Sequence, residues 1–598
     1  MAEQGDTLVH LYLRSCARYA DRPALGTKGE DGWRWTTYRE LKEQIDHFRG
    51  GLASLGIGEG DRVAIIANNR VEWVVACFAA HGLRASLVPM YEEQLAKDWR
   101  FILTDSGAKA VITASQPILD RVLDMQLPEL HVIGIGLPDD DPRSFSALTR
   151  VGSARPVAVR HPDAETVANL VYTSGTTGDP KGVILTHGNI ASNVTATIEV
   201  FPLEPDDRTL SFLPWAHSYG QVELYYVLTQ GASTAINDAI PHLLENLAEV
   251  RPTMLVAVPR IFNRIYETVN QQIASKPAFM RRLFQAGIHS AVRRSQGQRL
   301  NTLERLQLAV DDRLVFDKIR KKFGGRLEFV LSASAALSRE VAEFVDALGL
   351  TVYEGYGLSE TSPVVSANTR EHRKLGSVGR VIPGVRVEID ASKSEVPGHG
   401  EIIVYGPNVM RGYHNLPEAN AEVFTPDGGL RTGDLGYLDE EGFLFITGRI
   451  KEQYKLETGK YVMPAPIEEH LKLSPFISNI MLYGANRPYN VALVVLDEGA
   501  VRRWAAENEL EIGDLSSDPR VLQLIMGELS DRSSELKSYE VPRRALLLTE
   551  DFTTENDLLT PTMKLKRRNI EKRFRSKLDA LYGEPAPTGK GIGDIHPS

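Results

Sequence analysis

The chain of 598 residues has very little cysteine: only Cys16 and Cys77 are present. Two thiols form at most one bridge, so a disulfide framework and a cysteine-rich metal site are both excluded. The sequence also lacks an apolar run of eighteen or more residues, and we expect no membrane-spanning helix. The first thirty residues do not resemble an export signal, because charged side chains interrupt their apolar positions. We expect a cytoplasmic protein, and peripheral contact with the inner face of a membrane stays open.

Positive charge is not in excess either. The chain has 68 Lys and Arg against 78 Asp and Glu, which gives a net charge of −10. We therefore expect no nucleic-acid partner. A hydrophobic content of 42% with 24% charged residues is ordinary globular usage and excludes wholesale disorder.

Helical and strand patterns alternate in the first quarter of the chain. Apolar residues recur at helical spacing between Leu41 and Leu55, and Val63–Ala67 is typical of a buried strand. A helical stretch at 71–81 and strands near 87–88 and 110–112 follow. This alternation predicts an α/β fold in which helices cover both faces of largely parallel sheets.

The pattern changes further along the chain. Short, closely spaced strands between Val385 and Ile446 predict a β-barrel-like subdomain. We place a boundary after residue 449, which gives an N-terminal domain of residues 1–449 and a small α+β C-terminal domain of residues 450–584. Residues 585–598 are rich in Pro and Gly and are expected to be a disordered tail.

One region, residues 264–326, is strongly basic. It holds fourteen Lys or Arg against five Asp or Glu, a balance of +9, which leaves −19 on the rest of the chain. A solvated helical face explains this charge. The alternative is a docking surface for polyanions, either a phosphate-rich ligand or anionic lipid headgroups.

A segment rich in glycine and hydroxyl groups follows the strand pattern at 167–172. It reads Thr173-Ser174-Gly175-Thr176-Thr177-Gly178-Asp179-Pro180-Lys181-Gly182. Glycines let backbone amides converge on one centre, the hydroxyls donate hydrogen bonds, and Lys181 adds a positive charge. This combination suits a polyphosphate, although the spacing is not that of a Walker loop. The alternative is an ordinary Gly/Thr turn.

This segment resembles the signature of the AMP-forming adenylating superfamily, which includes acyl-CoA synthetases, luciferases of the firefly type and peptide-synthetase adenylation domains. The similarity extends from about residue 8 to about residue 582, and further motifs follow in the superfamily's order. Several features resemble the long-chain fatty acid–CoA ligase branch, among them the segments 455–462, 486–490 and 559–562 and the basic insert.

The resemblance implies a nucleotide site built from several segments. Tyr356 would stack on adenine, Glu360 would hold Mg²⁺, Asp434 would accept hydrogen bonds from the ribose hydroxyls, and Arg449 would assist it. From the residues alone, Glu354–Thr361 is equally a tight turn and Asp434 a turn residue. The implied nucleotide-binding residues are Thr173, Ser174, Gly175, Thr176, Thr177, Gly178, Lys181, Ser334, Ala335, Glu354, Gly355, Tyr356, Gly357, Ser359, Asp434 and Arg449.

Two other segments carry implied catalytic residues. The resemblance places Trp215, His217 and Tyr219 beside the acyl carboxylate, although a lone His among aromatics is equally a core residue. Lys564 occupies the place of the family's C-terminal catalytic lysine; without the resemblance it is the start of a basic helix. The implied catalytic residues are Thr173, His217, Glu360 and Lys564, and Ser332–Leu337 replaces the relatives' glycine-rich segment.

The resemblance implies a reaction in two steps. A carboxylate attacks the α-phosphorus of ATP, giving acyl-AMP and pyrophosphate, and the thiol of coenzyme A then displaces AMP. The C-terminal domain would rotate about Lys451 between the steps. One arrangement would bring Lys564 to the nucleotide for adenylation, and the other would bring the segment of Lys455 and Gly459 beside the pantetheine for thioester formation. The expected partners are ATP with Mg²⁺, a fatty acid and coenzyme A, and a homodimer stays open.

Other functions compete with this one. A medium-chain or aryl acid is an alternative substrate, because Trp215–Gly220 departs from the pattern of many long-chain members. An amino-acid adenylation domain would need an acidic residue near His217 to pair with the substrate ammonium, and none stands there. A non-catalytic nucleotide-binding protein or a membrane-surface protein are further alternatives.

Overall fold

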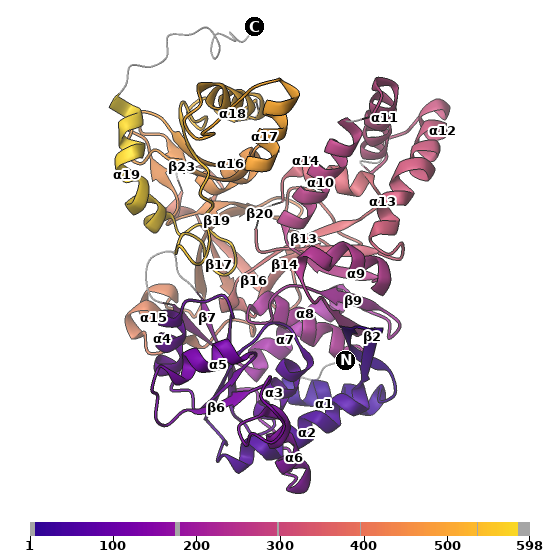
Figure 1. Cartoon of the computed structure of the whole chain (residues 1–598), viewed down its shortest axis with the longest axis vertical. Helices are drawn as coiled ribbons and strands as arrows, with labels where there is room; N and C mark the ends of the chain where they lie inside the picture. The colour runs from indigo at the N-terminus through magenta and orange to yellow at the C-terminus, as the bar shows by residue number, and fades with distance from the viewer. Residues whose placement is uncertain are drawn as a thin grey trace. The chain divides into compact units, whose positions relative to one another are not determined.

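A seven-stranded sheet with the order β18-β8-β7-β4-β3-β5-β6 lies in the N-terminal part of the chain (Figure 1). The structure is a computed structural model. It describes residues 6–583 except 174–179, 275, 296–297, 336, 395 and 535. The pairs β3–β4, β3–β5, β4–β7 and β5–β6 are parallel, whereas β7–β8 and β8–β18 are antiparallel. The strands are β3 (Arg62–Ile66), β4 (Ser86–Met90), β5 (Ala110–Thr113), β6 (His131–Gly134), β7 (Val167–Thr173), β8 (Lys181–Thr186) and β18 (Gly412–Tyr413).

Helices cover this sheet, which explains why its central strands are continuous apolar runs rather than alternating ones. The helix α3 is buried from Trp73 to His81 and packs against α2, β3 and β4. The helices of this part are α1 (Leu8–Arg18), α2 (Tyr38–Ser54), α3 (Val71–His81), α4 (Ala96–Ser106), α5 (Gln116–Leu123), α6 (Phe145–Ala154), α7 (His187–Val200) and α8 (Ser218–Thr229).

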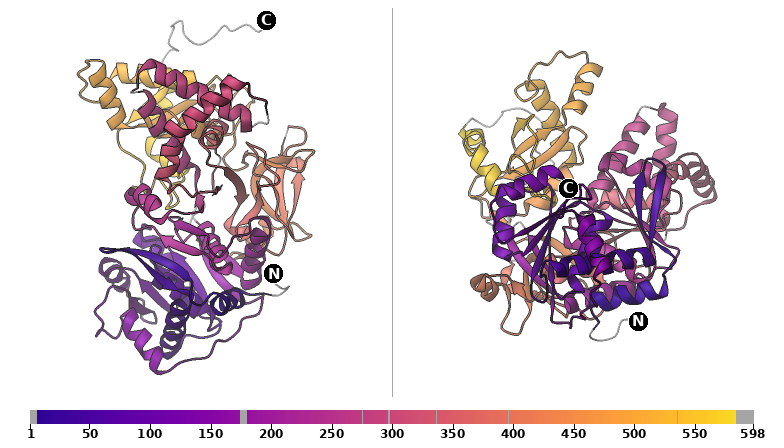
Figure 2. Two further views of the ribbon diagram at one scale, coloured as in Figure 1. Left: turned by 90° about the vertical axis from the view of Figure 1, so that its right-hand side faces the viewer. Right: turned by 60° about the horizontal axis from the view of Figure 1, so that its bottom comes forward.

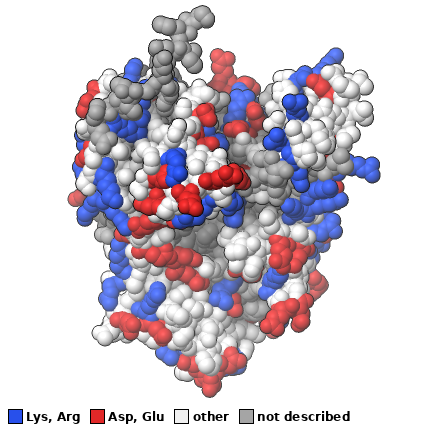
Figure 3. Space-filling model, turned by 45° about the horizontal axis from the view of Figure 1, so that its top comes forward, with Lys and Arg blue, Asp and Glu red and all other residues white. Residues whose placement is uncertain are grey.

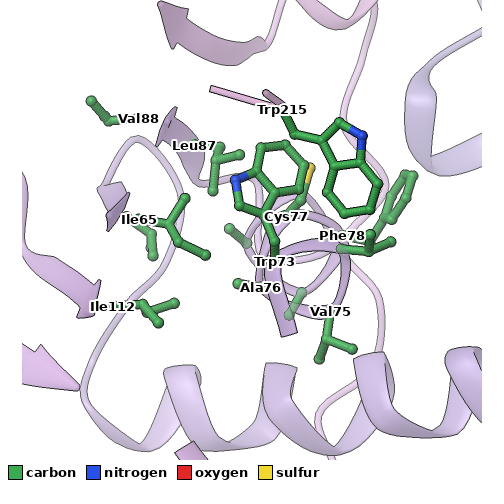
Figure 4. Packing of buried hydrophobic residues seen from close by; sticks show 14 of the residues in the cluster. Ile65, Trp73, Val75, Ala76, Cys77, Phe78, Leu87, Val88, Ile112 and Trp215 are labelled. Atoms are coloured by element: carbon green, nitrogen blue, oxygen red, sulfur yellow. The ribbon is translucent and has the colours of Figure 1, made fainter. Parts of the chain in front are cut away.

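Tightly packed aromatic and aliphatic side chains form the core beside α3 (Figure 4). The rings of Trp73 and Trp215 lie 5.6 Å apart between centroids, with Cys77 and Phe78 on the same helix as Trp73. Both cysteines are buried, and burial raises the pKa of the Cys16 and Cys77 thiols to about 12. Neither thiol is therefore poised as a nucleophile.

Helices α2 and α6 approach each other closely because glycines line their contact. A Cβ atom built on Gly152 would lie 1.7 Å from the carbonyl oxygen of His47, and one on Gly51 would lie 2.4 Å from that of Leu148. No side chain can occupy that space, so the helix contact depends on these glycines.

Two further sheets belong to the same part of the chain. The order β2-β1-β10-β9 contains β1 (Pro23–Gly29), β2 (Gly32–Thr37), β9 (Arg208–Ser211) and β10 (Ser233–Ile236). The order β11-β12-β13-β14-β15 contains β11 (Met254–Ala257), β12 (Phe329–Ser332), β13 (Val352–Gly357), β14 (Val364–Ala367) and β15 (Arg380–Val381).

The basic region predicted at 264–326 is helical. Helices α11 and α12 lie side by side (Figure 2), and α11 also packs on α14. The helices in and around this region are η1 (Ile240–His242), α9 (Leu243–Val250), α10 (Pro259–Ala274), α11 (Ala278–Ser295), α12 (Thr302–Asp311), the π-helix η2 (Asp312–Phe316), α13 (Asp317–Lys322) and α14 (Arg339–Ala347).

The chain divides into two compact units. The first contains residues 1–432 and 437–445, and the second contains residues 433–436 and 446–598, so the division falls within β19 and β20. The sheet β16-β17-β19-β20 takes the place of the predicted barrel-like subdomain, with β16 and β20 at its edges. Its elements and neighbours are η3 (Ser359–Thr361), β16 (Arg386–Asp390), η4 (Ala391–Lys393), β17 (Gly400–Tyr405), α15 (Pro417–Val423), β19 (Leu430–Leu438) and β20 (Leu444–Arg449).

The second unit has its own core around the sheet β23-β24-β25. Strands β23 and β24 are antiparallel and β24 and β25 are parallel, as a small α+β unit requires. Its elements are β21 (Tyr454–Lys455), β22 (Tyr461–Val462), α16 (Pro464–Leu471), β23 (Ile477–Tyr483), β24 (Val491–Leu496), α17 (Glu498–Glu507), α18 (Pro519–Arg532), β25 (Ala545–Leu548) and α19 (Arg567–Gly583).

Candidate nucleotide and acyl site

The predicted phosphate loop joins two paired strands. Thr173 ends β7 and lies opposite Lys181, which begins β8, so the two ends of the loop are fixed side by side. Ser174, Gly175, Thr176, Thr177 and Gly178 lie outside the described residues. The hairpin is anchored next to β18, where the amide of His414 donates to the carbonyl of Gly182 at 2.7 Å.

A chain of three side chains joins the phosphate loop to the predicted metal ligand. The Lys181 Nζ atom lies 4.9 Å from the centroid of the Tyr413 ring. The Tyr413 hydroxyl lies 2.8 Å from Oε1 of Glu360 and donates to it. The structure therefore brings together a lysine and a carboxylate that lie far apart in the sequence. Tyr413 was missed by the sequence analysis because nothing near it marks it as functional.

The predicted nucleotide clamp is part strand and part 3₁₀ turn. Glu354, Gly355, Tyr356 and Gly357 lie on β13, which pairs with β12 and β14, and the turn η3 begins at Ser359. A Cβ atom on Gly357 would lie 1.9 Å from the carbonyl oxygen of Pro363, so this position excludes every side chain.

Glu354 points into the protein rather than into solvent. Burial raises the pKa of its carboxyl to about 7, although amide hydrogen bonds from Gly376 and Leu337 and the charge of Arg373 oppose this rise. The bond from Leu337 ties β13 to the segment Ser332–Leu337. In that segment Ser334 has a φ of +77°, a left-handed conformation that favours glycine, and Ala335 is exposed.

The predicted acyl segment precedes α8. His217 caps this helix, because its Nδ1 atom accepts the amide of Tyr219 at 3.1 Å. Ser218 and Ser359 share a hydrogen bond of 2.9 Å between their hydroxyls, which places the His217 segment beside the Glu360 turn. Trp215 lies in the core against Trp73, and the Tyr219 hydroxyl donates to the Leu331 carbonyl at 3.2 Å.

Behind this segment lies a buried carboxyl group that the sequence analysis missed. Glu223 on α8 is buried, and it accepts hydrogen bonds from the hydroxyls of Thr209 at 3.0 Å and Ser211 at 2.9 Å. Burial raises its pKa to about 8, against the lowering effect of both hydroxyls. The Trp215 indole donates to the same Ser211 oxygen at 3.2 Å, so Glu223 stabilises the acyl segment from behind. A lone acid within the apolar run of α8 is the signal that predicts such a group.

The second unit contains the predicted ribose pair. The Arg449 Nε atom donates to Oδ1 of Asp434 at 2.7 Å, and the Asp434 side chain is buried while the Arg449 side chain is half-exposed. A buried carboxylate held by a cation keeps a fixed orientation and is ready to accept hydrogen bonds.

The segment expected beside coenzyme A is a short hairpin. Strands β21 and β22 pair Lys455 with Tyr461, and the turn between them contains Gly459 at a φ of +83°. The Lys455 Nζ atom lies 4.9 Å from the centroid of the Tyr461 ring. Lys451, the expected hinge residue, is exposed in a turn after β20.

The two candidate lysines of the C-terminal motif differ in their surroundings. The Lys566 Nζ atom pairs with Asp557, and the neighbouring Arg567 pairs with the buried Glu468. Lys564 is exposed, while its backbone is held by Thr560 through hydrogen bonds at both its amide and its carbonyl.

The residues present fit a magnesium ion that arrives with a nucleotide. Within the part of the chain that the structure describes, no cluster of three or more His, Cys, Asp or Glu side chains forms a metal site. Magnesium in phosphoryl-transfer sites is held by one or two carboxylates and by the substrate phosphates. Glu360, beside the phosphate hairpin, is such a carboxylate.

The chain matches known proteins along nearly its whole length. A family model described as AMP-binding enzyme matches residues 12–414, and one described as AMP-binding enzyme C-terminal domain matches residues 451–586. The long-chain-fatty-acid–CoA ligase FadD15 of Mycobacterium bovis is 35% identical over 573 residues, covering 92% of this chain and 93% of that protein. The peroxisomal long chain acyl-CoA synthetase 7 of Arabidopsis thaliana is 31% identical over 614 residues, covering 97% of this chain and 87% of that protein.

A solved structure shares the fold. The adenylation domain of a carboxylate reductase from Mycobacterium chelonae matches with a TM-score of 0.80 and 24% identity, covering 97% of this chain and 92% of that one. The chain belongs to the AMP-binding enzyme family and, within it, to the acyl-CoA synthetase branch. The predicted family and the predicted α/β fold class are confirmed.

Proposed function

We propose that this protein converts a long-chain fatty acid, ATP and coenzyme A into acyl-CoA, AMP and pyrophosphate through an acyl-AMP intermediate. The proposal depends on the contact series Lys181–Tyr413–Glu360, together with the hydrogen bond between Ser218 and Ser359. These contacts support the proposal because, within the first unit, they connect Lys181 with the predicted metal ligand Glu360 and connect the predicted acyl segment with the turn of Glu360.

In the first step, the residues of this unit bind and orient the triphosphate. The hydroxyl of Thr173, the loop that follows it and Lys181 hold the phosphates, and Glu360 holds the magnesium ion. The bound ion supplies positive charge to the phosphate oxygens as negative charge builds on them. The ring of Tyr356 and the backbone of Ser334 and Ala335 bind the adenine, and Glu354 holds these two segments together.

The acyl carboxylate lies beside His217. Since His217 caps α8 and Ser218 is tied to Ser359, the imidazole keeps a constant position relative to Glu360. The imidazole orients the carboxylate for in-line attack on the α-phosphorus. Trp215 and Tyr219 line the start of the acyl pocket.

The second unit acts in both steps, and we take its part from residue 450 onward as the mobile domain. Asp434 accepts hydrogen bonds from the ribose hydroxyls, and Arg449 holds the Asp434 carboxylate in place. Lys564 neutralises charge during adenylation. The Lys455–Tyr461 hairpin, in which Gly459 leaves room for a slender thiol arm, serves the thioester step after rotation about Lys451.

A panel of acids tests the substrate class. ATP–pyrophosphate exchange reports adenylation, and thioester formation with coenzyme A reports the second step. Long-chain fatty acids are expected to give both signals most efficiently. Higher kcat/KM for medium-chain or aryl acids would replace the long-chain assignment, and absence of exchange with every acid would overturn the proposal.

Replacement of the two C-terminal lysines tests the division of labour. Lys564→Ala is expected to lower pyrophosphate exchange by roughly a hundredfold or more, since charge stabilisation in a transition state is worth several kcal/mol. The same variant should still convert supplied acyl-AMP to acyl-CoA. Lys566→Ala serves as the matched control and should retain exchange, because Lys566 is paired with Asp557. Equal loss of both steps in Lys564→Ala would contradict the assignment.

A further inference from the structure

The most exposed apolar surface of the protein lies on the basic helices α11 and α12. Among the large hydrophobic side chains that the structure describes, the three most exposed are Leu303 at 75%, Phe279 at 70% and Leu306 at 66%. Met280 and Val310 are exposed in the same two helices. Single exposed apolar residues are ordinary, but five on two helices that pack side by side are an unusual concentration of exposed apolar surface.

The apolar residues of α12 form a stripe. Leu303, Leu306 and Val310 are spaced by three and four residues and therefore share one face. Leu308 and Asp311, which lie off this stripe, are buried. Helix α12 begins with a reciprocal capping box between Asn301 and Glu304. The capping box therefore stabilises the start of α12 without any contribution from the exposed apolar stripe.

Positive charge is concentrated on the same two helices and the elements next to them in the chain. Residues 264–326 carry a balance of +9, and the structure places the basic side chains of Arg282, Arg294, Arg299, Arg305, Arg313, Lys318, Lys321 and Lys322 at exposed positions. Figure 3 shows Lys and Arg bordering uncharged surface at the upper right, where Figure 1 places α11 and α12. No helix among the described residues is long and apolar enough to cross a bilayer.

We propose that α11 and α12 dock the protein onto an anionic lipid bilayer, with Phe279, Leu303 and Leu306 inserted among the headgroups and the surrounding Lys and Arg bound to lipid phosphates. An amphipathic helix with aromatic and aliphatic residues on one side and basic residues beside them lies in the plane of such an interface. A second copy of the same patch is a poor partner, because two surfaces of +9 repel each other. This inference goes beyond the proposed catalysis, since it requires no nucleotide.

Two double variants separate the apolar from the electrostatic contribution. Leu303→Ser with Leu306→Ser removes the stripe, and Arg294→Glu with Arg305→Glu reverses charge at exposed positions. Arg293 is left intact because it pairs with Glu304. The matched controls are Leu123→Ser and the pair Arg121→Glu with Arg155→Glu, which are exposed positions on or beside α5 and α6.

Co-sedimentation with phosphatidylcholine vesicles, with and without phosphatidylglycerol, measures binding of the full chain without ATP. The wild type is expected to bind the anionic vesicles and to be released by high salt. Each double variant should weaken the apparent affinity roughly tenfold or more, while the controls bind as the wild type does. Turnover of a soluble acid without vesicles should be the same in all variants, which shows that each is folded.

Three results would overturn the inference: no binding to anionic vesicles at low salt, equal binding to neutral vesicles, or unaltered binding by both double variants. Self-association that Leu303→Ser with Leu306→Ser abolishes, in a protein that ignores lipid, would instead identify a second copy as the occupant. None of these results bears on acyl-AMP formation, which pyrophosphate exchange measures separately.

Discussion

At the scale of single residues, the candidate site depends on polar groups that are buried or partly buried and that are paired. Glu223 lies behind the acyl segment, Glu354 joins two adenine-binding segments, and Tyr413 links Lys181 to Glu360. Each of them acts by holding another residue in place. An unpaired polar group in such surroundings is costly, so removal of one partner affects the other.

The raised pKa of Glu223 predicts a dependence of stability on pH. Its folded-state pKa of about 8 lies above its ordinary value of 4.5, so between these values the native state holds a proton that the unfolded chain has released. The contribution of Glu223 therefore decreases as pH rises through this window, by up to about 1.4 kcal/mol per pH unit. Glu223→Gln, which stays neutral, should lack this slope and gain stability relative to the wild type as pH rises. Urea unfolding followed by tryptophan fluorescence measures the difference, and parallel pH profiles would contradict it.

The hydroxyl of Tyr413 provides a second test at this scale. Tyr413→Phe keeps the ring beside Lys181 but removes the hydrogen bond to Glu360. This hydrogen bond orients Glu360 and contributes about 1 kcal/mol. Its loss should raise the KM for magnesium–ATP roughly fivefold with little change in kcat. Tyr405→Phe is the control, since the Tyr405 hydroxyl bonds to Glu388 and Asp427. An unchanged KM would show that Glu360 needs no such support.

At the scale of elements, periodicity predicted several helices and strands of the first quarter of the chain. The helical pattern at 71–81 coincides with α3, and the expected strands near 87–88 and 110–112 lie within β4 and β5. These elements were predictable because each buries a continuous apolar sequence. Strands β23, β24 and β25 of the second unit were predictable for the same reason.

Contacts distant in sequence could not be predicted in this way. Glu354–Gly357 has the composition of a turn, yet it forms a strand, because pairing with β12 and β14 outweighs the local preference of its glycines. The pairing of Asp434 with Arg449 came only from the family resemblance, since no spacing rule joins residues fifteen positions apart. The contacts of Tyr413 had no sequence signature, and the lone acid in the apolar run of α8 indicates a buried carboxyl at Glu223 without indicating its hydrogen-bond partners.

The crossing of α2 and α6 yields a stability prediction. Gly152→Ala would place a methyl group 1.7 Å from the His47 carbonyl, so the helices must separate. We expect a loss of about 1–3 kcal/mol or more. Gly136→Ala is the matched control, because its Cβ would meet only the Ala114 carbonyl at 3.7 Å. Thermal unfolding distinguishes them, and equal melting temperatures would refute a glycine-dependent contact.

At the scale of the whole molecule, two units share one chain that changes unit within β19 and β20. Asp434 and Arg449 belong to the second unit, whereas Lys181, Glu360 and His217 belong to the first. The proposed catalytic cycle therefore requires residues of both units. The proposed alternation between two half-reactions requires that the backbone near Lys451 change its dihedral angles.

Restriction of this turn tests the alternation. Lys451→Pro fixes φ and restricts Ile450 as well, so one arrangement of the units should be favoured over the other. We expect pyrophosphate exchange to be largely retained while thioester formation falls at least tenfold, because the second step requires the rotation. Lys451→Ala keeps the backbone free and should support both steps. Equal effects of proline on both half-reactions would rule out a hinge at this position.

The burial of both native thiols has a practical consequence. Maleimide reagents require an accessible thiolate, and neither Cys16 nor Cys77 offers one in the folded chain. A single cysteine introduced in each unit, for example at the exposed positions Lys460 and Arg155, would accept a donor and an acceptor dye without removal of either native cysteine. Energy transfer between such dyes would then report changes in the distance between the two units as ATP, fatty acid and coenzyme A are added in turn.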